Sequence, residues 1–175
     1  MDKSADHAQL AILALRSSDL FREVPEPDLA RLASYFEWLS VSKGQEIIKE
    51  GAVSDFSVLV VQGAFEVVKS RSGGQRLMGI AKDGALLGEL GLVTDEPRYA
   101  TCRAVETSAI CLLTRERFDQ MRGRDPDIHG LMLSGLMRQM ARRLRQVTEA
   151  IFSLKEKNDI AIDSARRILE TSMSP

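Results

Sequence analysis

The sequence predicts a mainly β domain with flanking helices, in which an antiparallel sandwich or barrel lies between short N-terminal helices and one long C-terminal helix. Two observations lead to this prediction. Short β-type runs separated by glycines and turn residues fill residues 41–124. Helical periodicity fills the segments on either side of them. We therefore divide the chain into N-terminal helices (1–40), a β core (41–124) and a C-terminal helical segment (125–175).

Two short amphipathic helices are predicted before the β core. Leu10, Leu13 and Leu15 form the first helical series. The second series follows the break at Pro25 and Pro27, and it extends to position 39. Its members are Leu29, Leu32, Tyr35, Phe36 and Leu39.

The β core contains short apolar runs that are typical of strands. These runs are SVLVV at 57–61, AFEVVKS at 64–70 and AICLL at 109–113. Between the second and third runs, SRSGGQ at 70–75 predicts a hairpin turn, because Gly73 and Gly74 allow the positive φ angles of a tight connection. We favour this turn over a phosphate-binding loop at the same place.

Asp125, Pro126 and Asp127 predict the start of a long helix, with an N-cap residue, a proline at the first helical position and an acidic first turn. Apolar residues then recur at heptad spacing, which predicts a homodimer through this helix. They are Leu133, Met137, Met140, Leu144, Val147, Ile151 and Leu154, followed more weakly by Asn158, Ala161, Ala165 and Ile168. Two alternatives stay open at Asn158: a polar position in a continuous coiled coil, or the end of the long helix before a short terminal one.

Length and composition limit the function classes. A chain of 175 residues suits one domain with one extra element. Lys and Arg number 24 against 25 Asp and Glu, so we expect no direct nucleic-acid partner and interpret the arginines at 138, 142, 143 and 145 as a solvated helix face. The N-terminal apolar run is too short and too polar for a membrane span, and a cytoplasmic protein is expected. Cys102 and Cys111 read as buried free thiols, and no metal site is predicted.

The stretch GELGLVTDEPRYAT at 88–101 carries the chemistry. Gly84 and Gly88 allow the backbone to approach a compact group, and a short helical turn at 89–92 directs free N–H groups at an anion. Arg98 offers a planar fork that suits two phosphate oxygens. Glu89 would repel a phosphate, so we assign it to a sugar hydroxyl. Phosphate and ribose together predict a nucleotide.

This stretch resembles the phosphate-binding cassette of the cyclic-nucleotide-binding domain family, in which a G-E-L-A-L element leads to P-R-A-A-T at the same separation. KGQEIIKEGAVSDFSVLVVQGAFEVV at 43–68 is similar to the first strands of that family, with Gly44, Gly51, Asp55 and Gly63 at matching positions. DPDI at 125–128 and QMARRL at 139–144 resemble the C-helix of bacterial catabolite activator proteins. The resemblance covers residues 15–150.

The resemblance implies a jelly-roll type β-roll that binds cyclic AMP or cyclic GMP. It implies that Glu89 holds the ribose 2′-hydroxyl and that Arg98 pairs with the cyclic phosphate. The backbone of Gly88, Leu90, Tyr99 and Ala100 would complete the phosphate site. Val67 would line the purine wall, and Thr148 on the C-helix would contact the base.

One departure affects ligand choice. The family places Ala, Ser or Thr directly after the arginine, with Thr favouring guanine, whereas this chain has Tyr99. Thr148 gives a slight preference for cyclic AMP. The alternative is a vestigial pocket in which Glu89 and Arg98 form an ion pair that only holds the cassette together.

The function that follows from these residues is a dimeric cyclic-nucleotide sensor that relays ligand occupancy through its C-helix to a protein partner. About twenty residues follow Leu154, too few for the helix-turn-helix domain of catabolite activators. His7 and His129 have no nucleophile or metal ligand nearby in the sequence, so no enzymatic activity is expected. The alternative from another class is a structural dimerisation adaptor whose pocket is vestigial or takes an altered ligand.

Overall fold

The computed structural model describes the backbone of residues 3–172 and the side-chain surroundings of residues 6–159. The chain forms two compact units, one ending at Leu136 and the other beginning at Met137. The first unit is a β-roll with flanking helices, which confirms the predicted fold class. The second unit is the continuation of the last helix.

The β-roll consists of two four-stranded sheets whose neighbouring strands are antiparallel. The first sheet has the order β1-β8-β3-β6, with β1 Glu37–Val41, β8 Ser108–Thr114, β3 Phe56–Gln62 and β6 Leu86–Leu87. The second has the order β2-β7-β4-β5, with β2 Glu46–Ile48, β7 Thr101–Ala104, β4 Phe65–Arg71 and β5 Gly74–Ala81. The predicted hairpin turn at 70–75 joins β4 to β5, and the pair Arg71 and Gly74 closes it.

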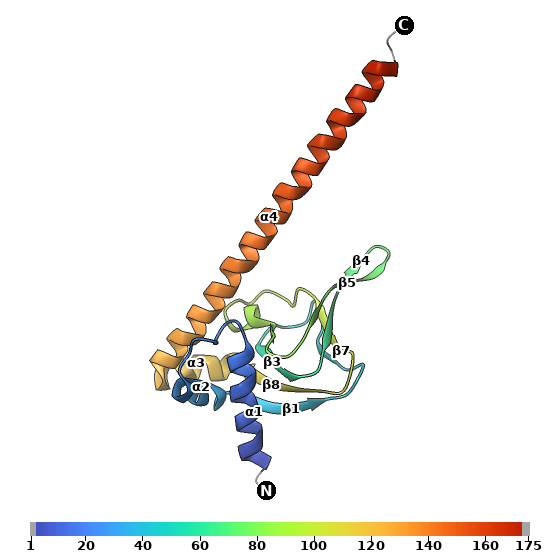
Figure 1. Cartoon of the computed structure of the whole chain (residues 1–175). Helices are drawn as coiled ribbons and strands as arrows, with labels where there is room; N and C mark the ends of the chain where they lie inside the picture. The colour runs from blue at the N-terminus through green and yellow to red at the C-terminus, as the bar shows by residue number, and fades with distance from the viewer. Residues whose placement is uncertain (1–2, 173–175) are drawn as a thin grey trace. The chain divides into compact units, whose positions relative to one another are not determined.

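Two apolar clusters hold the first unit together. One lies between the sheets and includes Val58, Phe65 and Ile110. The other packs the helices α1 (Lys3–Ser17), α2 (Glu26–Ala33) and α3 (Arg115–Arg124) against the first sheet, through residues such as Phe21 and Met121. Figure 1 shows these three helices gathered beside β1, β3 and β8. The β-roll therefore keeps one face covered by helices.

The boundaries of the β core differ from the sequence prediction at both ends. The second helix ends at Ala33 instead of near residue 40, and Leu39 lies in β1, where it pairs with Ile110 of β8. Strand pairing overrides the helical spacing of these apolar residues. At the other end, α3 lies inside the predicted β core. Thr114 caps it by accepting a hydrogen bond from the Arg117 N–H at 3.2 Å.

The last helix, α4 (Pro126–Ser172), runs without a break through Asn158 and Asp159, so the continuous alternative holds for the backbone. Asp125 precedes it, and its carbonyl accepts a hydrogen bond from the His129 N–H at 2.9 Å. The Asp125 carboxylate also contacts two side chains of the preceding helical region. It accepts hydrogen bonds from Tyr35 Oη at 2.6 Å and from Arg31 Nη2 at 2.5 Å, and these bonds lower the pKa of Asp125.

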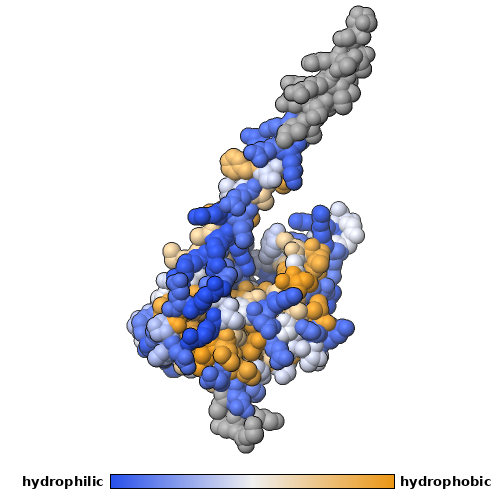
Figure 2. All heavy atoms as spheres, in the orientation of Figure 1, coloured by the Kyte–Doolittle hydropathy of each residue, from blue (hydrophilic) through white to orange (hydrophobic). Residues whose placement is uncertain are grey.

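The second unit exposes a row of large apolar side chains along α4. They include Met137, Leu144, Val147, Ile151 and Leu154, with exposed fractions between 56% and 70%. Figure 2 shows apolar residues among hydrophilic ones on the described part of this helix. Within the described residues, none of the helices has the length and apolar character needed to cross a bilayer.

Candidate functional site

The candidate site begins where the backbone turns at Gly88 into a short 3₁₀ helix, η1 (Glu89–Leu92). Gly88 has a φ of 68°, in the left-handed region that favours glycine. A Cβ atom there would lie 2.5 Å from Arg98 Nη1 and 2.8 Å from Ile48 Cδ1. Gly88 therefore satisfies two requirements at once, because it makes the turn and leaves room for the arginine. We call residues 88–100 the cradle.

Gly84 has a different role from the predicted one. A Cβ at this position would lie 2.6 Å from Ser17 Oγ, so Gly84 allows α1 to pack closely and does not face the cradle arginine. Gly91 is the second glycine beside Arg98, because its Cβ would come within 2.8 Å of Arg98 Nη1 and 2.6 Å of Ser54 Oγ. The sequence spacing alone could not separate these two uses of glycine.

Arg98 is the central charge of the cradle. Its side chain is buried, with the whole residue 5% exposed. Nη1 donates to the Gly88 carbonyl at 3.0 Å, and Nη2 donates to the Phe56 carbonyl at 2.7 Å. The guanidinium also lies over the Phe56 ring, 4.2 Å from its centroid. Burial lowers the pKa of Arg98, while the nearby carboxylates of Asp55 and Glu89 favour its charged form.

Glu89 is buried beside this charge, at 3% exposure. Its carboxylate favours the charged form of the Arg98 guanidinium, which also donates hydrogen bonds to two main-chain carbonyls. The vestigial alternative, in which Glu89 and Arg98 only hold the cradle together, stays a prediction beside the ligand-binding one. The two groups predicted for phosphate and ribose lie in the same buried site.

The chain around Arg98 is fixed by the preceding loop. The Arg98 N–H donates to the Ala52 carbonyl, and the Arg98 carbonyl accepts from the Gly51 N–H, both at 2.9 Å. Tyr99 follows with 61% of its surface exposed, and Ala100 is buried. These contacts explain why the segment at 51–55 and the cradle, far apart in the sequence, form one structure.

Arg115 is a site residue that the sequence analysis missed. It stands at the first position of α3, and its Nε donates to the Gly91 carbonyl at 2.8 Å. Its Nη2 donates to the Ser54 carbonyl at 2.6 Å and also to the Thr94 carbonyl. Nη1 pairs with Asp95. A single side chain thus ties η1 and the loop after it to the start of α3.

The three other residues predicted to contact the ligand lie on three different elements. Val67 lies on β4, partly buried, and packs against the cluster between the sheets. Leu90 lies on η1 and is 45% exposed. Thr148 belongs to the second unit, where its hydroxyl donates to the Leu144 carbonyl at 2.9 Å. Its contact with a base stays a prediction.

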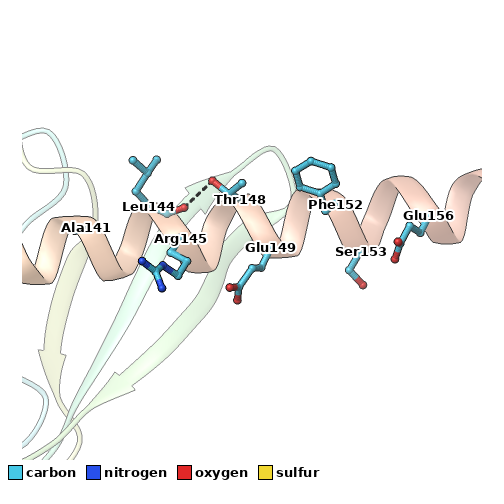
Figure 3. Close-up of a pocket in the computed structure, with 8 residues that line it drawn as sticks. All are labelled: Ala141, Leu144, Arg145, Thr148, Glu149, Phe152, Ser153 and Glu156. Atoms are coloured by element: carbon cyan, nitrogen blue, oxygen red, sulfur yellow. Dashed lines mark hydrogen bonds between the residues drawn. The ribbon is translucent and has the colours of Figure 1, made fainter.

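A shallow hollow surrounds Thr148, and α4 supplies its whole lining. Figure 3 shows Leu144, Thr148 and Phe152 on one side of the helix and Arg145, Glu149 and Glu156 on the other. Because one helix cannot enclose a ligand, we interpret the hollow as part of an exposed helix face.

The two cysteines are buried inside the β-roll. Cys102 and Cys111 are free and buried, and burial raises the pKa of each thiol to about 11. In the part of the chain that the structure describes, no group of three or more His, Cys, Asp and Glu side chains is arranged to hold a metal ion.

The chain is similar to several known proteins. Cyclic GMP-dependent protein kinase 2 of Homo sapiens is 31% identical over 112 residues, which are 62% of this chain and only 15% of the kinase. The cyclic AMP receptor protein of Thermus thermophilus is 26% identical over 164 residues, which are 92% of this chain and 74% of that protein. The solved structure of a cyclic nucleotide-binding domain from Methylobacillus flagellatus has the same fold, with a TM-score of 0.74 and 21% identity over 85% of this chain and 84% of that chain.

A family model provides the assignment. It is described as the cyclic nucleotide-binding domain, and it matches residues 38–125, half of the chain. The matched range contains both sheets and the cradle with Gly88, Glu89 and Arg98. This chain belongs to the cyclic nucleotide-binding domain family.

Proposed function

We propose that this chain binds cyclic AMP or cyclic GMP in the cradle and acts as a dimeric sensor. Arg98 pairs with the cyclic phosphate, and Glu89 accepts a hydrogen bond from the ribose 2′-hydroxyl. Main-chain groups of Gly88, Leu90, Tyr99 and Ala100 surround the phosphate. Val67 lines the purine wall, and Thr148 contacts the base.

One observation carries this proposal, namely the state of Arg98. Its guanidinium is buried in the cradle, and it donates hydrogen bonds to the Gly88 and Phe56 carbonyls. Burial of a cation is costly, and a phosphate anion at the cradle offsets part of that cost. A cyclic phosphate also has a ribose beside it, which suits the buried carboxylate of Glu89.

The proposed output passes through α3 to α4. A phosphate that draws the cradle toward Arg98 displaces η1, and Arg115 carries this displacement to the first turn of α3. The junction before Asp125 then shifts, and the apolar row of α4 changes its packing against a second copy. The second copy and a protein partner that reads this change are part of the proposal, as is a cytoplasmic location.

Isothermal titration calorimetry of nucleotide-stripped protein against cyclic AMP and cyclic GMP tests the proposal. We expect saturable binding of at least one nucleotide. Arg98→Ala should weaken it at least a hundredfold, about 3 kcal/mol, because it removes a charge-assisted contact to the phosphate. Arg76→Ala is the matched control, since Arg76 is an exposed residue of β5 outside the cradle.

The ratio of the affinities for cyclic AMP and cyclic GMP also gives the base preference, which the presence of Tyr99 leaves open. If neither nucleotide binds below millimolar concentration, the proposed function is wrong. An adaptor that pairs through α4 and has a vestigial or altered pocket would then be favoured. Thermal unfolding of each variant separates lost binding from lost folding.

A further inference from the structure

The last peptide unit of the cradle is held differently from the two before it. The Arg98 N–H and the Arg98 carbonyl are tied to the main chain of Ala52 and Gly51, so these bonds do not depend on any side chain. The next carbonyl, that of Tyr99, accepts a hydrogen bond from Lys69 Nζ. The Tyr99–Ala100 peptide therefore depends on the identity of residue 69.

Lys69 lies at the correct place for this contact. It follows Val67 by two positions on β4, so the two side chains project from the same face of the strand, apart from local irregularity. The Lys69 side chain is only 17% exposed. Its ammonium also lies 4.1 Å from the centroid of the Tyr99 ring. Lys69 thus contacts both the carbonyl and the ring of Tyr99.

Glu50 keeps Lys69 in this position. Glu50 Oε1 lies 2.9 Å from Lys69 Nζ, and Oε2 accepts a hydrogen bond from the Ser70 N–H at 2.8 Å. The Glu50 N–H in turn donates to Thr101 Oγ1 at 3.0 Å. The hydrogen bonds from Ser70 and Lys69 lower the pKa of Glu50 from 4.5 to about 2, so the carboxylate stays charged at neutral pH. Glu50 and Lys69 form an anchored pair beside the cradle.

We propose that Lys69 is a positioning residue that directs the Ala100 N–H toward the bound phosphate. A trans peptide is planar, and its C=O and N–H groups point in opposite directions. A bond that fixes the Tyr99 carbonyl on the β4 side therefore fixes the Ala100 N–H on the opposite side. The ammonium itself is engaged by Glu50 and Tyr99, so Lys69 acts through this peptide and not by contact with the ligand. The inference rests on the proposed function.

Calorimetry on the full chain tests the role of Lys69, using cyclic AMP and cyclic GMP as probes. Lys69→Met keeps an apolar stem and removes the donor, and we expect about tenfold weaker binding of whichever nucleotides the wild type binds. Lys69→Arg restores a donor and should recover most of the loss. Lys43→Met is the matched control, because Lys43 is exposed in the loop before β2. We expect wild-type affinity for this control.

A second measurement distinguishes a changed orientation of the Ala100 N–H from a general loss of order in the cradle. The two phosphorothioate diastereomers of the bound nucleotide each replace a different exocyclic oxygen with sulfur. The Ala100 N–H donates to only one of these two oxygens. Lys69→Met should therefore change the affinity ratio of the two diastereomers by threefold or more. A site that is only loosened loses affinity for both equally.

The possible outcomes are distinct. Loss of affinity with a changed diastereomer ratio and recovery in Lys69→Arg supports the role of Lys69. Wild-type affinity in Lys69→Met overturns it, and so does a loss that leaves the ratio unchanged. A wild-type protein that binds neither cyclic nucleotide overturns the proposed function, and the role of Lys69 with it.

Discussion

Arg98 contacts the protein through both terminal nitrogens and through the face of its guanidinium. A guanidinium carries five N–H donors, and the hydrogen bonds to Gly88 and Phe56 use one on each terminal nitrogen. These two bonds, together with the Phe56 ring, fix the plane of the guanidinium before any ligand arrives. A fixed fork loses little conformational entropy when it pairs with an anion, which favours tight binding of a phosphate.

Gly88→Ala tests whether the shape of the turn matters for binding. The methyl group would be strained at a φ of 68° and would crowd Arg98 Nη1. We expect a loss of about 1–2 kcal/mol in the free energy of unfolding from the left-handed backbone. We also expect at least tenfold weaker nucleotide binding, measured by calorimetry, because Arg98 must move.

Gly44→Ala is the control for this substitution. Gly44 has a similar φ of 83°, but a Cβ there meets no atom within 4 Å. It should lose similar stability and keep the wild-type affinity. Equal affinities for the two variants would show that Gly88 serves the turn alone and not the position of Arg98.

The sequence identified the charged residues of the cradle but not those that hold it. Glu89, Arg98 and the small residues near them form a short contiguous pattern with a chemical meaning. Arg115 and Lys69 lie 17 and 29 positions from Arg98, and each acts on main-chain carbonyls. Every residue has a main-chain carbonyl, so a contact to one does not depend on the side chain of the residue that accepts the bond. Such contacts can be found only from the structure.

At the scale of elements, η1 and α3 are joined through one side chain. Arg115→Met keeps the stem and removes the donors to the Gly91 and Ser54 carbonyls. Because both residues are buried, the change should cost about 1–3 kcal/mol in the free energy of unfolding. Nucleotide affinity should also fall, on the order of tenfold, since η1 is no longer fixed. Thermal unfolding and calorimetry measure the two effects.

Arg122→Met provides the comparison on the same helix. Arg122 lies in the last turn of α3 and is exposed. We expect it to resemble the wild type in both measurements. If Arg115→Met matched Arg122→Met in unfolding and in affinity, then the cradle and α3 would be coupled by other contacts, and the route proposed for the signal would be wrong.

The sequence predicts an element most accurately where its apolar pattern fits only one type of secondary structure. The strands β3, β4 and β8 follow their apolar runs closely. Leu39 of β1 continues the helical series of the preceding apolar residues, yet pairing with β8 decides its conformation. Helix α3 buries only Phe118 and Met121, so its periodicity is too weak to stand out from the strand before it. Tertiary contacts decide these two cases, and a local pattern does not contain them.

At the scale of the whole molecule, the apolar row on α4 predicts self-association. Leu144 and Ile151 belong to the heptad series and are 69% and 59% exposed. Leu144→Glu combined with Ile151→Glu removes about 1.5–3 kcal/mol of burial per side chain and places like charges across the interface. We expect a monomer in sedimentation velocity at a concentration at which the wild type is a dimer.

Ser153→Glu is the control for this pair, because Ser153 lies on the same helix outside the heptad series and is exposed. It should sediment as the wild type does. A wild-type chain that is monomeric at high micromolar concentration would contradict dimerisation through α4. The cradle would then need another route to a partner.

A crystal structure of the protein grown with its preferred cyclic nucleotide tests the central claim most directly. We expect the cyclic phosphate to lie against the Arg98 guanidinium and the Ala100 N–H, with the ribose 2′-hydroxyl on the Glu89 carboxylate. A nucleotide bound outside residues 88–100, or a cradle that stays empty at saturating ligand, would contradict it.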